Sequence, residues 1–85
     1  LWEKAFKLFT PIATKHPFHI LALDCVHRCH AALGDAAAAQ QALDAIAKAV
    51  ATDDRAQSMA EKYGDLLSDE ARAALAPTGA KIAAA

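Results

Sequence analysis

The chain has 85 residues and a formal net charge of −1, from 9 Lys and Arg residues against 10 Asp and Glu. This length excludes a multidomain enzyme, and it allows one small domain or a piece of a larger one. The basic residues are spread between acids, so there is no direct nucleic-acid signal. No apolar run approaches the roughly 20 residues of a membrane span, and no signal peptide is visible, so we expect a cytoplasmic protein without a membrane partner.

The chain has few large side chains with which to build a core. Hydrophobic residues make up 55% of the sequence, but 24 of these 47 are alanine. A single core in a chain of this size contributes only ~3 to 5 kcal/mol, so we expect a partner or more of the same chain. The chain begins at Leu1 and its only methionine is Met59, so we expect it to be an excerpt of a longer chain.

The first half of the sequence predicts two helices. From Leu1 to about Phe9, apolar residues recur at helical spacing, and Pro11 should kink or end this helix. Pro17 bars continuation, and a second helix is expected from Phe18 to Leu33. That helix is apolar on both faces, which indicates a position between two other helices.

The second half predicts three more helices. Gly34 and Asp35 end one helix and cap the next, whose buried stripe includes Leu43 and Ile46. The residues that follow predict a capped fourth helix, and then a short fifth one that starts at Ser68 and ends before Pro77. The fourth helix should be lined by Met59, Tyr63, Leu66 and Leu67.

These elements predict an all-α fold of antiparallel helical hairpins, with about four main helices and a short C-terminal one. Residues 1–76 should form a helical repeat segment and residues 77–85 a flexible tail. The residues expected in the core are Ile20, Leu23, Val26, Leu43, Ile46 and Tyr63.

An internal repeat supports stacked hairpins. Shifting the sequence by 34 residues superposes Ala5 on Ala39 and Phe9 on Leu43. This is the tetratricopeptide period, and residues 1–51 resemble one full tetratricopeptide repeat preceded by half of another. The resemblance implies a helical scaffold whose concave surface binds helices or extended peptides.

A second resemblance rests on two short strings. The residues 7–12, Lys-Leu-Phe-Thr-Pro-Ile, and 19–24, His-Ile-Leu-Ala-Leu-Asp, followed by Arg28, resemble the auxiliary subunit of the N-terminal acetyltransferase A complex. That family is itself a tetratricopeptide superhelix. The resemblance implies a catalytic acetyltransferase subunit and the ribosome as partners, and no catalytic residue in this chain.

The partner-binding residues that we infer are Leu21, Asp24 and Arg28. In tetratricopeptide repeats, the positions of Asp24 and Arg28 tend to face the concave groove. The alternative is a simple ion pair on the surface, because the two residues lie one helical turn apart.

Residues 16–30 contain four histidines and two cysteines, and His and Cys are the usual zinc ligands, so a metal site is one hypothesis for this segment. On a continuous helix, however, Cys25 and Cys29 project away from His27 and His30, so four ligands cannot converge there. Residues 25–30 also have the pattern C-x-x-x-C-H, which is one residue longer than the C-x-x-C-H motif that attaches c-type haem. Met59 is a conceivable further ligand of the haem iron. We expect Cys25 and Cys29 to be unbridged packing groups, because their helical spacing suits a disulfide poorly.

No catalytic motif is visible in the sequence, and no phosphate loop or nucleophile elbow. We therefore expect a non-enzymatic scaffold for protein–protein interaction, without cofactor, metal or small-molecule substrate. The alternative is a small helical protein that binds a metal or c-type haem through Cys25, Cys29 and His30.

Overall fold

The structure, a computed structural model, describes residues 1–83. Within this range it contains helices and no strand. The α-helices are α1 (Trp2–Lys15), α2 (Ile20–Ala32), α3 (Ala36–Thr52), α4 (Asp54–Tyr63) and α5 (Asp69–Leu75), and two short 3-10 helices are η1 (Gly64–Leu66) and η2 (Ala76–Thr78). This confirms the predicted all-α fold of helical hairpins, with four main helices and a short C-terminal one.

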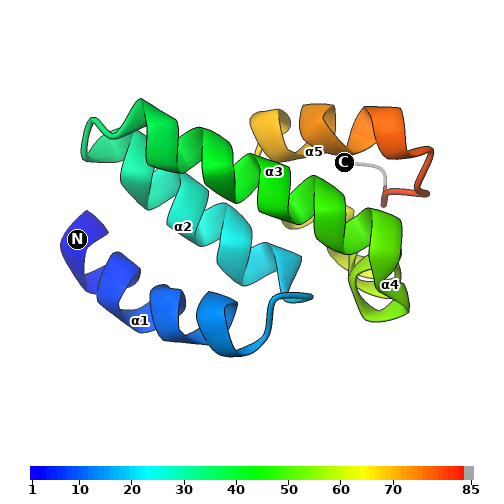
Figure 1. The fold of residues 1–85 in the computed structure, drawn as a ribbon, viewed down its shortest axis with the longest axis horizontal. Helices are drawn as coiled ribbons and strands as arrows, with labels where there is room; N and C mark the ends of the chain where they lie inside the picture. Colours follow the sequence, from blue (N-terminus) through cyan, green and yellow to red (C-terminus); the bar gives the residue numbers. More distant parts are fainter. Residues whose placement is uncertain (84–85) are drawn as a thin grey trace.

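The first three helices stack side by side in chain order, and α4 and α5 both pack against α3. Figure 1 shows α2 between α1 and α3, with α5 on the opposite side of α3 from α2 and α4 behind. The apolar character of both faces of α2 is explained by this position, as the sequence predicts. Trp2 and Ala36, which begin α1 and α3, are 34 residues apart, and so are Ile20 and Asp54, which begin α2 and α4.

The ends of the first two helices differ from the sequence prediction. α1 continues through Pro11 to Lys15. Pro11 is exposed, so the Lys7 carbonyl, which receives no hydrogen bond from a proline, lies on the solvent side of the helix. α2 begins at Ile20 and not at Phe18, because the His19 Nδ1 accepts a 3.1 Å hydrogen bond from the Ala22 N–H and so acts as the N-cap.

The later helix ends follow the predicted capping. Gly34 has a φ of 86°, which glycine tolerates and which ends α2. The Asp35 carboxylate then caps α3 by accepting from the Ala38 N–H at 3.0 Å. Ser68 caps α5 in the same manner, through the Ala71 N–H.

The core confirms four of the six predicted residues and corrects two. Ile20, Leu23, Val26 and Ile46 are buried, but Leu43 is only partly buried and the prediction for Tyr63 is wrong, since Tyr63 is 48% exposed. The inner stripe of α4 consists instead of the small residues Ala56 and Ala60, and Gly64 at the start of η1 continues it; all three are buried. Small side chains let α4 approach its neighbours closely, and the tyrosine is left on the outer side.

The segment after α5 covers this small-residue stripe. The Ala83 N–H donates to the Ala60 carbonyl at 3.0 Å, and Ile82 packs against the core. The predicted flexible tail, residues 77–85, is thus packed against the helices over residues 77–83 (Figure 1). The rest of that prediction falls on residues 84 and 85, outside the described residues.

Candidate functional site

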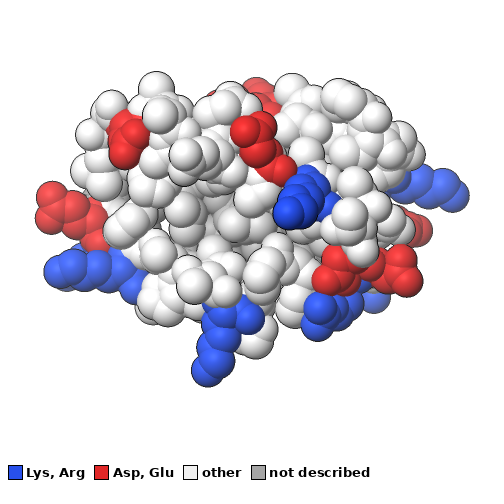
Figure 2. All heavy atoms as spheres, in the orientation of Figure 1, with Lys and Arg blue, Asp and Glu red and all other residues white. Residues whose placement is uncertain are grey.

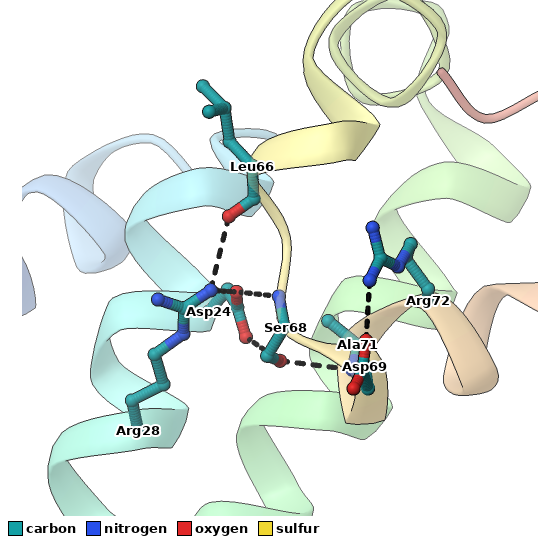
Figure 3. Close-up of polar contacts among 7 residues, drawn as sticks. All are labelled: Asp24, Arg28, Leu66, Ser68, Asp69, Ala71 and Arg72. Carbon is teal, nitrogen blue, oxygen red and sulfur yellow. Dashed lines mark hydrogen bonds and ion pairs between the residues drawn. The ribbon is translucent and has the colours of Figure 1, made fainter. Parts of the chain in front are cut away.

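Asp24, one of the residues inferred to bind a partner, lies at the centre of a polar network. Its Oδ1 accepts from the Ser68 hydroxyl at 2.6 Å, and its Oδ2 accepts from the Ser68 N–H at 2.7 Å and from the Arg28 Nη2 at 3.0 Å. Figure 3 shows these bonds converging on the Asp24 carboxylate from the Arg28 side chain and from the start of α5. The network joins α2 to a segment 44 residues later in the chain.

The structure corrects the inference for Asp24. Asp24 is only 2% exposed and both of its oxygens are occupied within the chain, so it does not face an open groove. The ion pair of the alternative is present, at 3.0 Å, but it is not a surface pair, because 41% of the Arg28 side chain is exposed against 3% of the Asp24 side chain. A buried carboxylate is stable here because hydrogen bonds and a cation replace its water.

The other two inferred residues remain accessible. Leu21 and Arg28 are partly buried and lie seven residues apart, on the same face of α2 as the half-buried Cys25. The Arg28 Nη2 also donates to the Leu66 carbonyl at 3.1 Å. Leu66 therefore lies next to Arg28. The Leu66 side chain is 59% exposed and points away from the network (Figure 3). We call these four residues, Leu21, Cys25, Arg28 and Leu66, the α2–η1 surface.

Sequence reasoning missed Ser68 and Leu66 as members of this site. Ser68 carries a local signal as a helix cap, but no local signal connects it with Asp24. The contact depends on how η1 folds the chain back over α2, and no pattern in the sequence specifies that path.

The two cysteines are free thiols, as predicted, with Cys29 buried and Cys25 partly buried. Burial raises the pKa of both thiols above the ordinary value; for Cys25 the nearby Arg28 guanidinium opposes this rise, and Asp24 and Cys29 add to it. A thiol with a raised pKa is mostly protonated at neutral pH and reacts slowly.

The histidines of this region have packing and capping roles. His27 is buried, with its Nδ1 3.4 Å from the Ala39 carbonyl, and His30 stacks edge-on against Phe6 at a centroid distance of 5.0 Å. Over residues 1–83, no three His, Cys, Asp or Glu side chains lie close enough to hold a metal ion together. Cys25, Cys29 and His30 therefore do not form a ligand set in this structure.

Six large apolar side chains within residues 1–83 are exposed, one of them Leu33 at the turn between α2 and α3. Leu1, Trp2 and Leu8 belong to the N-terminal end of the molecule, and Tyr63 and Leu66 lie at the junction of α4 and η1. Figure 2 shows a broad uncharged face, with basic side chains projecting along the lower left edge, where α1 runs in Figure 1. A protein surface that exposes grouped apolar side chains is typical of interaction sites.

No known protein family, curated protein or solved structure significantly matches the chain. Within residues 1–83, no helix is both long enough and apolar enough to cross a bilayer.

Proposed function

We propose that this chain is a non-enzymatic helical-repeat scaffold that mediates protein–protein interaction, and that the α2–η1 surface is a partner-binding site. The observation that carries the proposal is the position of Leu66 beside Arg28: an exposed leucine next to a partly exposed arginine that is held in place. Such a pair combines an apolar contact with a directed donor, and arginine is among the residues enriched at the centres of interfaces.

Arg28 keeps donor capacity for a partner. Its contacts to Asp24 and Leu66 both use Nη2, and none within residues 1–83 uses Nη1. Because the buried Asp24 carboxylate fixes the guanidinium, less side-chain entropy is lost when a partner's carbonyl or carboxylate accepts from Nη1.

The 34-residue offset between helix starts supports the repeat architecture within this proposal. The resemblance to the auxiliary subunit of the N-terminal acetyltransferase A complex names one partner to look for, a catalytic acetyltransferase subunit on translating ribosomes. Two free thiols fit the reducing cytoplasm, which we propose as the location.

The experiment is affinity capture from cell extract with the 85-residue chain and two variants, followed by mass spectrometry. Leu66→Asp places a charge on the α2–η1 surface, and Leu33→Asp does the same at the α2–α3 turn, where the leucine is 50% exposed. We expect one set of proteins to be captured by the unmodified chain and by Leu33→Asp, and lost with Leu66→Asp. Equal recovery by all three chains, or a stoichiometric small ligand in the purified protein, would overturn the proposal.

A further inference from the structure

After α5 the chain turns back and returns to α4 (Figure 1). The return begins at Gly79, whose φ of 72° is left-handed and ends η2. Four residues later, the Ala83 N–H donates to the Ala60 carbonyl of α4 at 3.0 Å. We call residues 79–83 the strap. It is a non-helical segment that is seated on a helix.

A specific notch on α4 receives one side chain of the strap. Ala60 and Gly64 belong to the small-residue stripe, and Ile82 packs against the core beside them. A β-carbon at Gly64 would overlap the Ile82 Cγ2, so the isoleucine fills the space that the glycine leaves free. The strap is thus recognised through one backbone hydrogen bond and one branched aliphatic side chain.

The next helix leaves this part of α4 to the strap. α4 and α5 follow α2 and α3 by about one repeat period of 34 residues. α2 and α3 pack along their length, whereas α4 and α5 make little direct contact and α5 packs on α3. Part of the small-residue stripe is therefore covered by the strap and not by a helix.

Few interactions hold the strap in place. Ala80 and Ile82 are partly buried, Lys81 between them is exposed, and no residue of the strap is fully buried. This alternation is that of an extended segment with every second side chain turned inward. Within residues 1–83, the bond from Ala83 to Ala60 is the only hydrogen bond that joins the strap to another helix.

The strap also fits its site incompletely. An open cavity of about 370 Å³ remains beside it, lined by Thr78–Lys81 on one side and by residues of α3 and α4 on the other. Gln57 and Glu61 give this cavity a polar wall, and Glu61 forms no ion pair within residues 1–83. A long side chain that ends in a cation would therefore fit better than the methyl group of Ala80.

We propose that this site binds an extended segment of another protein, and that the strap occupies the site in the free chain. The partner's segment carries a branched aliphatic residue at the place of Ile82 and an arginine or lysine at the place of Ala80. Its backbone donates to the Ala60 carbonyl, as the Ala83 N–H does, and its cation pairs with Glu61. Backbone bonds supply affinity in this mode, and side-chain pockets supply specificity. The inference goes beyond the proposed function, because the site does not include the α2–η1 surface.

The test uses the sequence of the strap as its probe. One fluorescein-labelled peptide has the sequence of residues 77–83, Pro-Thr-Gly-Ala-Lys-Ile-Ala. A second peptide carries Ala80→Arg, and a third carries both Ala80→Arg and Ile82→Ser. The receptors are the unmodified 85-residue chain and the same chain with Ile82→Ser, which removes the side chain that holds the strap. Fluorescence anisotropy measures binding.

We expect the Ile82→Ser chain to bind the Ala80→Arg peptide at least about ten-fold more tightly than the unmodified chain does, because an attached strap competes at high effective concentration. The peptide that also carries Ile82→Ser should bind at least about ten-fold more weakly, and so should a receptor with an added Gly64→Ala. An added Glu61→Gln should weaken binding at least about three-fold. The matched control is Glu70→Gln, which removes an exposed charge outside the cavity and should leave binding unchanged.

Hydrogen exchange tests the opening of the strap in the unmodified chain. We expect the amide of Ala83 to exchange at least about 100-fold faster than that of Ile46 in the core, because the strap opens while the helices stay folded. Equal protection of the two amides would show that the strap leaves only on global unfolding, and this would overturn the proposal.

Three results of the binding test would also overturn it. Loss of helical circular dichroism in the Ile82→Ser chain would make the strap a part of the folding core. Equal affinity for all three peptides, or no binding of any, would remove the extended segment as the ligand. Concentration-dependent dimers that Ile82→Ser abolishes, without peptide binding, would indicate exchange of straps between two copies of this chain. None of these results affects the capture experiment with Leu66→Asp.

Discussion

At the scale of single residues, the Asp24 carboxylate joins α2 to the start of α5. It accepts hydrogen bonds from a side chain of its own helix and from the backbone and side chain of Ser68. The sequence places Asp24 and Arg28 one turn apart, and that pairing is present. The sequence does not indicate the second partner of Asp24, because Ser68 is 44 residues away and its only local signal is that of a helix cap.

Replacing Asp24 should therefore destabilise the fold. We expect Asp24→Ala to lower the free energy of unfolding by about 2 to 4 kcal/mol, since the Ser68 N–H and hydroxyl lose their acceptor in a partly buried place. We expect a smaller loss of stability than for a fully buried ion pair, because Arg28 is partly exposed. Urea denaturation followed by circular dichroism measures the change.

The matched control for this change is Asp69→Ala. Asp69 also pairs with an arginine on its own helix, Arg72, but its side chain is 91% exposed. We expect a change of under about 0.5 kcal/mol. Similar losses for Asp24→Ala and Asp69→Ala would show that the network does not hold η1 and α5 to α2.

The cysteines give a prediction with a defined sign. Burial raises the folded-state pKa of Cys25 and Cys29, so above the ordinary thiol pKa the unfolded chain loses protons that the folded chain keeps. Stability contributed by the neutral thiols is thus complete below that pKa and is lost as the pH rises toward the folded-state value. We expect the urea midpoint to fall between about pH 8 and pH 10, and to fall less in Cys25→Ala/Cys29→Ala.

The same burial should slow thiol chemistry. Native-state labelling with a disulfide reagent at neutral pH should be slow at both cysteines and become rapid in denaturant. Rapid labelling of both thiols in the folded protein, together with an equal pH dependence of the two chains, would contradict the burial of these residues.

At the scale of helices, local signals predicted most starts and stops, and tertiary contacts explain the exceptions. Gly34 with Asp35 and Ser68 with the acids after it were recognised because capping depends on neighbouring residues. Pro11 was expected to kink or end α1, but the helix continues through it to Lys15, with the proline on the exposed side, where water can reach the free Lys7 carbonyl. Histidine is an uncommon N-cap, so the role of His19 was not indicated by its residue type.

α4 provides a test of how helices pack in this fold. Gly64 continues the small-residue stripe of Ala56 and Ala60, and a β-carbon there would overlap the Ile82 side chain and lie 2.9 Å from the Ala83 nitrogen. We expect Gly64→Ala to destabilise the protein by about 1 to 3 kcal/mol, because the segment of residues 77–83 must move. Thermal or urea unfolding measures the loss.

A double variant distinguishes this contact from a local effect on the helix end. In an Ile82→Ala background, the cost of Gly64→Ala should shrink, since part of the overlap is removed. An unchanged cost in that background would indicate that residues 77–83 do not pack on Gly64.

At the scale of the whole molecule, alanine content and the 3.6-residue pattern were enough to predict the fold class. The position of α2 between two helices also followed from its residues, because both of its faces are apolar. The placement of Tyr63 and of residues 77–83 did not follow. Both depend on the close approach that small residues on α4 allow, and small residues give a weak hydrophobic signal in sequence.

The candidate site was predicted only in part for the same reason. Leu21 and Arg28 lie on one face of α2 and are partly exposed, but Leu66 joins them through the fold of η1. Sequence alone did not indicate which large apolar residues would stay exposed, since that depends on the area that neighbouring helices cover.

The central claim is that the α2–η1 surface binds a protein. It is tested most directly by a photo-crosslinking amino acid placed at position 66 in one chain and at position 33 in another, both irradiated in cell extract. The two leucines are similarly exposed, at 59% and 50%. We predict a discrete cross-linked protein at position 66 that is absent at position 33. The same products from both positions, or none from position 66, would contradict the claim.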